Sequence, residues 1–166
     1  MAKQEKSPDE LQDDNERTTS MGLYVTAEAY RQSAMLLDDK ALWRAPNKIG
    51  HAQMPVRFLY SHAIELYLKA LLRTRHGIDV IRDKYRHSFR LLLPEAEDIG
   101  LVLTCSDRDL FAVMIDTDAL IETRYLRTGP KFEGEIVDIE KLRDTCTRVR
   151  DSVDDLLRKA DLLVQR

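Results

Sequence analysis

The sequence contains little cysteine and no long apolar run, and these two absences narrow the class of protein. Its 166 residues include only two cysteines, Cys105 and Cys146, which lack metal-ligand spacing and form no Cys-x-x-Cys pair. This usage fits two free thiols in a reducing compartment. No run reaches the roughly 18 apolar residues that a membrane-spanning helix needs, and the first twenty residues lack the apolar centre of a secretory signal. We therefore expect a cytoplasmic protein with no membrane partner.

Common catalytic signatures are missing as well. The chain has no zinc-type cluster of His and Cys, no glycine-rich phosphate loop and no Ser-His-Asp arrangement. The whole net charge of −3 lies in the first twenty residues, so the remainder is neutral and exerts no bulk attraction on a nucleic acid backbone. Arginine outnumbers lysine, which favours bidentate contacts wherever a local basic patch occurs. We expect neither a metal nor a cofactor.

The chain divides into a tail and one domain. Residues 1–20 are polar and charged, with a single leucine and no aromatic residue, so they cannot bury enough apolar surface to become ordered. We interpret them as a disordered acidic tail, which is either a partner-binding segment or only a solvated end. The remaining residues, 21–166, have the length of one domain.

Apolar residues recur at three- and four-residue steps in five segments, which is the pattern of amphipathic helices. The expected helices begin near 23, 55, 88, 106 and 138 and end near 41, 72–75, 98, 125 and the C-terminus. No segment has the features of a strand. The pattern predicts an all-α fold, an up-and-down bundle of about five helices. The second helix is apolar on nearly every face, so we place it at the centre.

Particular residues predict the helix ends. Gly77 is suited to the position just after the second helix, and Ser88 is a plausible N-cap of the third. Pro94 either kinks the third helix or marks a later start. Ser106 and Asp109 match the capping pattern Ser-x-x-Asp at the start of the fourth helix.

The last helix carries a seven-residue apolar repeat with alternating steps of three and four. Its members are Ile139, Leu142, Cys146, Val149, Val153, Leu156, Ala160 and Leu163. Such a seam is typical of coiled coils. It either packs inside the bundle of one chain or pairs two copies.

Part of the second and third helices matches a family motif. The stretch His-Ala-Ile-Glu-Leu-Tyr-Leu-Lys-Ala-Leu-Leu at 62–72 precedes a glycine loop, and Tyr-Arg-His-Ser-Phe-Arg-Leu-Leu follows at 85–92. This pattern resembles HEPN domains, helical modules linked to nucleotide or RNA chemistry. Glu65, Lys69 and His87 stand at the motif positions, while Ser-Phe replaces the usual Asp-Leu after the histidine.

Near the end of the fourth helix, Arg124 and Tyr125 resemble the Arg-Tyr element of the same family. The resemblance implies a dimer and, in catalytic members, RNA cleavage by an Arg and a His that are separated by four to six residues. Here residues 129–131 are Gly, Pro and Lys, so the standard ribonuclease motif is missing. In a working site of this kind, Arg holds the scissile phosphate and His transfers a proton.

The resemblance therefore implies a nucleotide- or RNA-associated homodimeric module of a prokaryotic defence, toxin–antitoxin or stress system. Two alternatives stay open. One is a non-catalytic scaffold that captures a protein partner or a second copy through its tail or its C-terminal helix. The other is a metal-independent ribonuclease with a displaced histidine, in which His87 approaches Arg124.

The candidate site residues fall into two groups. The catalytic candidates are His87 and Arg124. The nucleotide- or RNA-binding candidates are His62, Glu65, Lys69, Lys84, Arg86, Arg90, Tyr125 and Arg127.

Each candidate also has a structural interpretation. His62, Glu65 and Lys69 are three and four residues apart, so they share one face of the expected helix. Glu65 and Lys69 form either an intrahelical i,i+4 pair or a polar spot that orients a ligand phosphate. His87 either caps a helix or bonds back to Glu65, or it joins neighbouring cations in a phosphate-binding corner at a helix N-terminus. Arg124 either pairs with an acid such as Asp116 or, with Tyr125, grips a phosphate and stacks a base.

Overall fold

The computed structural model describes residues 13, 16–38, 54–116 and 137–162, and the structural statements below concern these residues. The elements are α2 (Ser20–Asp38), α3 (Met54–Leu72), the short α4 (Ile78–Val80), a π-helix η2 (Ile81–Tyr85), α5 (Phe89–Ile99), α6 (Cys105–Asp116) and α8 (Ile139–Lys159). The described ranges contain no strand, so the predicted all-α class is confirmed. None of these helices has the length and apolar character needed to cross a membrane.

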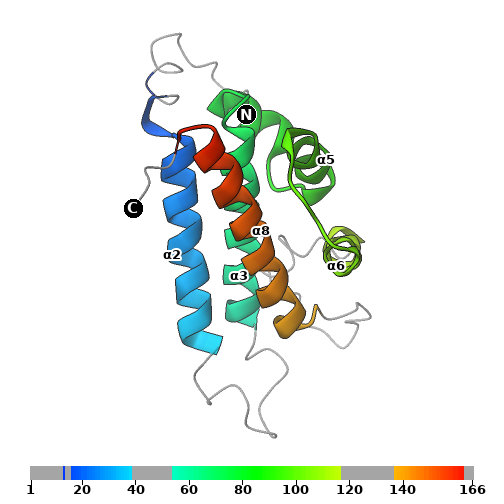
Figure 1. Ribbon diagram of the computed structural model, residues 1–166. Helices are drawn as coiled ribbons and strands as arrows, with labels where there is room; N and C mark the ends of the chain where they lie inside the picture. Colours follow the sequence, from blue (N-terminus) through cyan, green and yellow to red (C-terminus); the bar gives the residue numbers. More distant parts are fainter. Residues whose placement is uncertain (1–12, 14–15, 39–53, 117–136, 163–166) are drawn as a thin grey trace, which may run out of the picture.

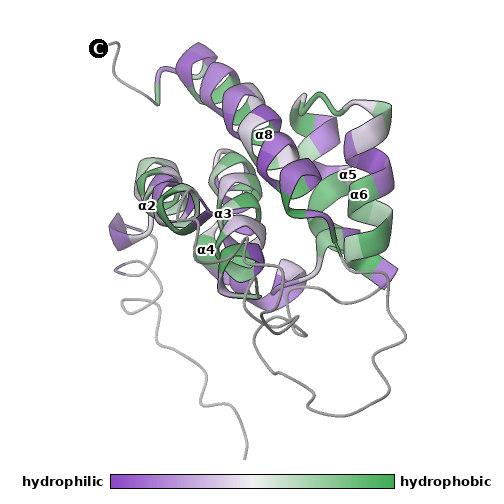
Figure 2. Ribbon diagram, turned by 90° about the horizontal axis from the view of Figure 1, so that it is seen from below, coloured by the Kyte–Doolittle hydropathy of each residue, from purple (hydrophilic) through white to green (hydrophobic). Residues whose placement is uncertain are grey.

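The helix α3 lies at the centre of the bundle, as its all-round apolar sequence predicts. It packs against α2, α8 and α5 (Figure 1). α2 and α3 run antiparallel, and α8 crosses them on one side. Seen from below, α5 and α6 lie on the side of α3 away from α2 and run across its axis (Figure 2). The up-and-down arrangement thus applies to α2 and α3, while α5 and α6 form a crossing layer.

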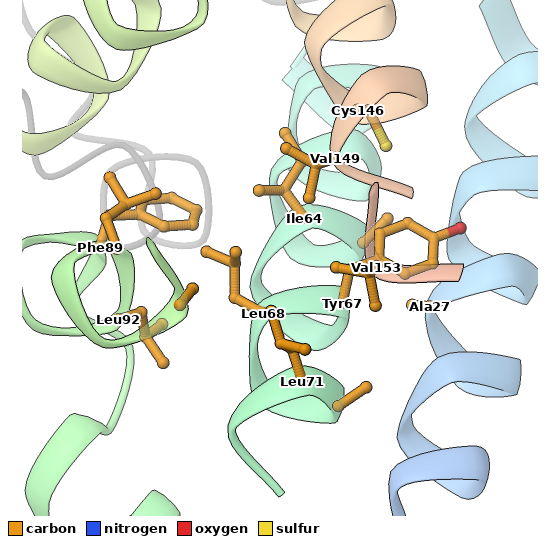
Figure 3. Packing of buried hydrophobic residues seen from close by; sticks show 14 of the residues in the cluster. Ala27, Ile64, Tyr67, Leu68, Leu71, Phe89, Leu92, Cys146, Val149 and Val153 are labelled. Carbon is orange, nitrogen blue, oxygen red and sulfur yellow. The ribbon is translucent and has the colours of Figure 1, made fainter. Parts of the chain in front are cut away.

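The core is built from one face of each neighbour of α3. Figure 3 shows Ala27 of α2, Phe89 and Leu92 of α5 and Val149 and Val153 of α8 around the apolar side chains of α3. Leu92, Val149 and Val153 have no exposed surface. Burying a side chain of this size contributes about 1.5–3 kcal/mol. The apolar contacts therefore hold three separate helices against one central helix.

The apolar repeat of the last helix is buried inside one chain. Leu142, Cys146, Val149 and Val153 have no exposed surface and face the core. The next fully buried residue is Leu157 rather than Leu156, because a straight helix of 3.6 residues per turn drifts away from a seven-residue repeat. α8 ends at Lys159, before the C-terminus that the pattern predicted, and Leu163 lies outside the described residues. The repeat is thus an internal seam of the bundle.

Several helix ends differ from those predicted. α2 begins at Ser20 rather than near 23, and Arg73 Nε donates to the carbonyl oxygen of Thr18 at 2.9 Å, so the last residues assigned to the tail already contact the bundle. Most of the predicted tail lies outside the described residues. Gly77 has φ −65° and precedes α4 instead of closing α3 in the left-handed region. α3 itself ends at Leu72, within the predicted range of 72–75.

The third predicted helix is confirmed as α5, with Ser88 at its N-cap position. Pro94 lies inside α5, so it does not start the helix. Gly100 closes it with φ +124°, a conformation that favours glycine, and its N–H donates to the carbonyl oxygens of Ala96 and Glu97.

α6 is capped two residues earlier than predicted. Thr104 Oγ1 accepts from the amide of Asp107 at 3.2 Å, and Asp107 Oδ2 accepts from the amide of Thr104 at 2.9 Å. This reciprocal pair is a capping box, which replaces the predicted Ser106–Asp109 pair. The predicted continuation of this helix to 125 lies outside the described residues.

Candidate functional site

The carboxylate of Glu65 is the centre of a buried polar cluster. Its side chain has no exposed surface. Lys69 Nζ donates to Oε1 at 2.5 Å, and His87 Nδ1 lies 2.7 Å from the same oxygen. His62 Nδ1 lies 3.3 Å from Oε2. An ionised carboxylate only accepts hydrogen bonds, so both imidazoles donate to it through Nδ1.

The cluster keeps Glu65 ionised in spite of its burial. Burial alone raises the pKa of a carboxyl group. The hydrogen bond from His62 and the positive charge of Lys69 outweigh that effect and lower the pKa of Glu65 to about 2. Glu65 is therefore a fixed negative charge at neutral pH, with its protein donors arranged around it.

Two local features bring these residues together. His62, Glu65 and Lys69 occupy one face of α3 because they are three and four residues apart, as the sequence predicted. His62 is also held by rings that the sequence analysis did not single out: it stacks on Phe58 at 5.5 Å and meets Tyr30 edge-on at 4.5 Å between centroids. Its side chain is only 16% exposed, so it lies mostly inside the protein.

His87 reaches Glu65 from outside α3, across 22 positions of sequence. It follows η2, whose last turn closes with the amide of Arg86 donating to the carbonyl oxygen of Ile81. Arg86 itself has φ 47° and ψ −115°, a strained backbone for a residue with a Cβ. π-helical turns and strained residues both concentrate at functional sites. Neither feature has a signal in the sequence pattern.

The predicted contact from His87 back to Glu65 is present, and His87 is also accessible. Its side chain is 48% exposed, whereas that of Glu65 is fully buried. The buried carboxylate thus holds one edge of an imidazole whose side chain is about half exposed to solvent. A carboxylate that orients an imidazole through Nδ1 is a common device for proton transfer and for anion recognition.

Two of the predicted cations lie beside His87 in the chain. Arg86 and Arg90 are exposed, and within the described ranges neither forms an ion pair with an acid. Arg86 Nε donates to the carbonyl oxygen of Asp83 at 3.3 Å. The first turn of α5 holds no acidic residue, and the Ser88 side chain makes no capping bond. The α5 N-terminus therefore combines amide groups, the helix dipole and two guanidinium groups that pair with no acid among the described residues.

Lys84 belongs to a different cluster. Its Nζ donates to the hydroxyl of Tyr85 at 3.0 Å, and that hydroxyl donates to Glu95 Oε2 at 2.8 Å. His76 Nε2 lies 3.0 Å from the other oxygen of Glu95. These contacts tie η2 to α5. The sequence predicted that Lys84 shares a phosphate-binding corner with His87, and the contact that the structure gives it is with the Tyr85 hydroxyl.

A second buried carboxylate, Asp107, was missed by the sequence analysis. Arg148 contacts Oδ1 through Nη2 at 2.7 Å and through Nε at 3.0 Å, and Thr145 Oγ1 donates to the same oxygen at 2.7 Å. Burial raises the pKa of Asp107, but the hydrogen bonds from Arg148 and Thr104 lower it to about 2. The Thr104-x-x-Asp107 spacing was the available signal. This group joins α6 to α8 and is a structural contact.

The remaining predicted site residues, Arg124, Tyr125 and Arg127, lie outside the described residues, as does any approach of His87 to Arg124. Across the described segments, no group of three or more His, Cys, Asp or Glu side chains is placed to hold a metal ion. In comparisons with known proteins, the chain matches no family model, no curated protein and no solved structure. The HEPN resemblance of residues 62–92 therefore stays a prediction.

Proposed function

We propose that this chain binds a phosphate group of a nucleotide or RNA at His87 and the first turn of α5. The observation that carries the proposal is the contact between the buried carboxylate of Glu65 and the half-exposed imidazole of His87 at 2.7 Å. An imidazole held in one orientation loses little freedom when a ligand arrives, which favours binding. Arg86 and Arg90 supply the guanidinium groups that recognise phosphate through two parallel hydrogen bonds.

The charges around His87 favour an anion. The negative charge of Glu65 lies inside the protein and is paired with Lys69, whose Nζ is 2.5 Å from Oε1. The charges of Arg86 and Arg90 lie on the surface. The positive end of the α5 dipole adds to them. A phosphate at this corner thus meets cations and amide donors, while the nearest carboxylate is already bonded.

The biological setting is the part of the proposal that rests on the motif at 62–92. HEPN-like modules serve prokaryotic defence, toxin–antitoxin or stress systems, and we assign this chain the same kind of role, as a nucleotide- or RNA-binding module in the cytoplasm. The two cysteines form no disulfide, which agrees with a reducing compartment.

A ribonuclease is the second candidate, and the Glu65–His87 contact favours it. A carboxylate that fixes an imidazole is the arrangement used by many general bases. Cleavage would need a second group to stabilise the charge that develops on the phosphate, and an arginine fulfils that role well. Arg86 and Arg90 are the described arginines nearest to His87 in the chain.

The test is a binding titration of the full chain with ATP and with a fluorescently labelled single-stranded RNA, without metal. We expect binding that weakens with salt. Arg90→Ala should reduce the affinity about tenfold or more, because a charge-assisted hydrogen bond contributes about 1.5–3 kcal/mol. The matched control is Lys141→Ala, which removes an exposed cation from the start of α8 and should leave the affinity unchanged.

Two results would contradict the proposal: no binding of either probe at millimolar concentration, or equal losses in Arg90→Ala and Lys141→Ala. The same RNA is then examined for cleavage. Cleavage that disappears in His87→Ala, with the helical content unchanged by circular dichroism, would establish the ribonuclease instead of the binding module.

A further inference from the structure

The outward face of α2 is unusual because it carries no charge. Eight residues of α2 are exposed, and all are uncharged: Gly22, Val25, Thr26, Ala29, Gln32, Ser33, Met35 and Leu36. The helix does contain charged residues, but they are part-buried and bonded inward. Glu28 contacts Tyr67 and Arg150, and Arg31 contacts Glu28. This inverts the usual amphipathic pattern, in which charges face the solvent.

Seven of the eight residues form one continuous stripe. At 100° per residue, all but Met35 fall within a band about 120° wide that is centred on Ala29. Val25 and Leu36, at 56% and 68% exposure, are the large apolar side chains of this stripe. We call these seven residues the α2 outer face. Among the described helices, none covers it: α2 forms one flank of the molecule (Figure 1).

The two hydroxyl groups of the α2 outer face already form hydrogen bonds within the helix. Thr26 Oγ1 donates to the carbonyl oxygen of Gly22 at 2.8 Å, and Ser33 Oγ donates to that of Ala29 at 2.8 Å. Covering these hydroxyls would leave no unpaired donor, so the usual penalty for burying polar groups is small. The face is therefore suited to burial, although it is open in one chain.

We infer that the α2 outer face pairs with the same face of a second copy of this chain, in an antiparallel arrangement about Ala29. A two-fold axis at Ala29 places Leu36 of one copy opposite Gly22 of the other, and Val25 opposite Ser33. Large side chains then meet small ones at both ends, as self-complementary interfaces require. A parallel pairing would place Leu36 against Leu36 and leave a gap between the glycines. Antiparallel helices also oppose their dipoles favourably.

The size of the face agrees with a dimer of modest stability. Seven exposed residues of this size offer on the order of 500 Å² per copy, so a pair buries about 1,000 Å², which is the lower end for a specific interface. The α2 outer face thus takes the place of the α8 seam as the dimer interface, because that seam is buried inside one chain.

The dimer would leave the two His87 corners apart. In both views α5, which begins two residues after His87, lies on the opposite side of α3 from α2 (Figures 1 and 2). Each copy therefore keeps its own phosphate-binding corner on an outer flank. The inference is independent of the proposed function, because either can fail without the other.

The first test is sedimentation velocity of the full chain over a hundredfold range of concentration. We expect a concentration-dependent dimer. Ala29→Arg places a charge on the axis and should give a monomer with unchanged helical content. The matched control, Thr147→Arg, adds the same side chain to an exposed position of α8 and should leave the dimer intact. A wild type that is monomeric throughout, or a dimer that survives Ala29→Arg, would overturn the inference.

Disulfide trapping tests the antiparallel register. In a Cys105→Ser background, which removes the exposed thiol, a mixture of Gly22→Cys and Leu36→Cys chains should form a mixed disulfide on mild oxidation. Leu36→Cys alone should form none. Self-linking of Leu36→Cys without the mixed product would show a parallel pair and would reject the proposed register. Ala29→Arg and the wild type should give the same result in the ATP titration, because the phosphate-binding corner lies away from the α2 outer face.

Discussion

Buried polar atoms decide much of the local chemistry at the scale of single residues. Glu65 and Asp107 are both fully buried, and each is surrounded by several donors. Two buried tyrosines differ in the hydrogen bonding of their hydroxyl groups. The Tyr67 hydroxyl donates to Glu28 Oε1 at 2.5 Å, while the Tyr60 hydroxyl has no hydrogen-bond partner in the described part of the chain. Similar side chains on one helix thus differ in what their hydroxyl contributes.

We expect Tyr67→Phe and Tyr60→Phe to have different effects on stability. Tyr67→Phe leaves the part-buried Glu28 carboxylate without one donor and should lower the free energy of unfolding by about 1–3 kcal/mol. Tyr60→Phe removes a hydroxyl that is already unpaired, so the change should lie within about 0.5 kcal/mol of zero or be stabilising. Urea unfolding at pH 7 measures both. Equal losses would show that the Tyr60 hydroxyl has a partner.

At the scale of secondary-structure elements, the segment between α3 and α5 is the part of the chain that contains His87 of the candidate site. The sequence predicted a break after the second helix and a helix start at Ser88. It did not predict α4 or η2. A π-turn differs from an α-turn only in which carbonyl oxygen accepts the hydrogen bond of each backbone amide, and the sequence pattern does not show this difference. This segment nevertheless sets the position of His87, through the turn at Arg86.

The strain at Arg86 leads to a prediction about stability. With φ 47° and ψ −115°, this backbone favours glycine, and relief of such strain contributes about 1–3 kcal/mol. Arg86→Gly should therefore unfold at higher urea than Arg86→Ala, although glycine ordinarily costs about 0.5–1 kcal/mol more backbone entropy than alanine. Both variants should bind the RNA probe more weakly, since both lose the guanidinium group. Arg86→Ala as the more stable variant would contradict the strain.

The two buried carboxylates shape the pH dependence of the whole molecule. The pKa values of Glu65 and Asp107 are both lowered to about 2. A group whose pKa is depressed in the folded state contributes its full stability above its unfolded pKa, about 4, and loses that contribution as the pH falls toward 2. Stability should therefore fall steeply below about pH 4.5 as these groups approach protonation.

Glu65→Gln tests this dependence. A difference of one pKa unit corresponds to about 1.4 kcal/mol, so the ionised Glu65 contributes on the order of 3 kcal/mol at neutral pH. The variant should be less stable at pH 7 and should lose less stability between about pH 4.5 and 2. Asp155→Asn, on the exposed side of α8, is the control and should keep the slope of the wild type. Parallel curves for Glu65→Gln and the wild type would reject the depressed pKa.

Much of the helical architecture follows from local periodicity alone. The all-α class and the central place of α3 were predicted correctly, as were the common face of His62, Glu65 and Lys69. These features depend on residues three or four apart, and their geometry is set by the helix itself. The contact between His87 and Glu65 was one of the three alternatives that the sequence left open for this histidine.

Only the packing of the helices against one another decided which neighbour each helix face contacts. The repeat of α8 has the same spacing whether it faces α3 or a second chain, and its burial against the core settled the choice. The uncharged outer face of α2 became visible only once Glu28 and Arg31 were seen to bond inward. A sequence pattern gives the angle between residues on one helix. It does not give the partner that each face meets, because that partner comes from distant parts of the chain.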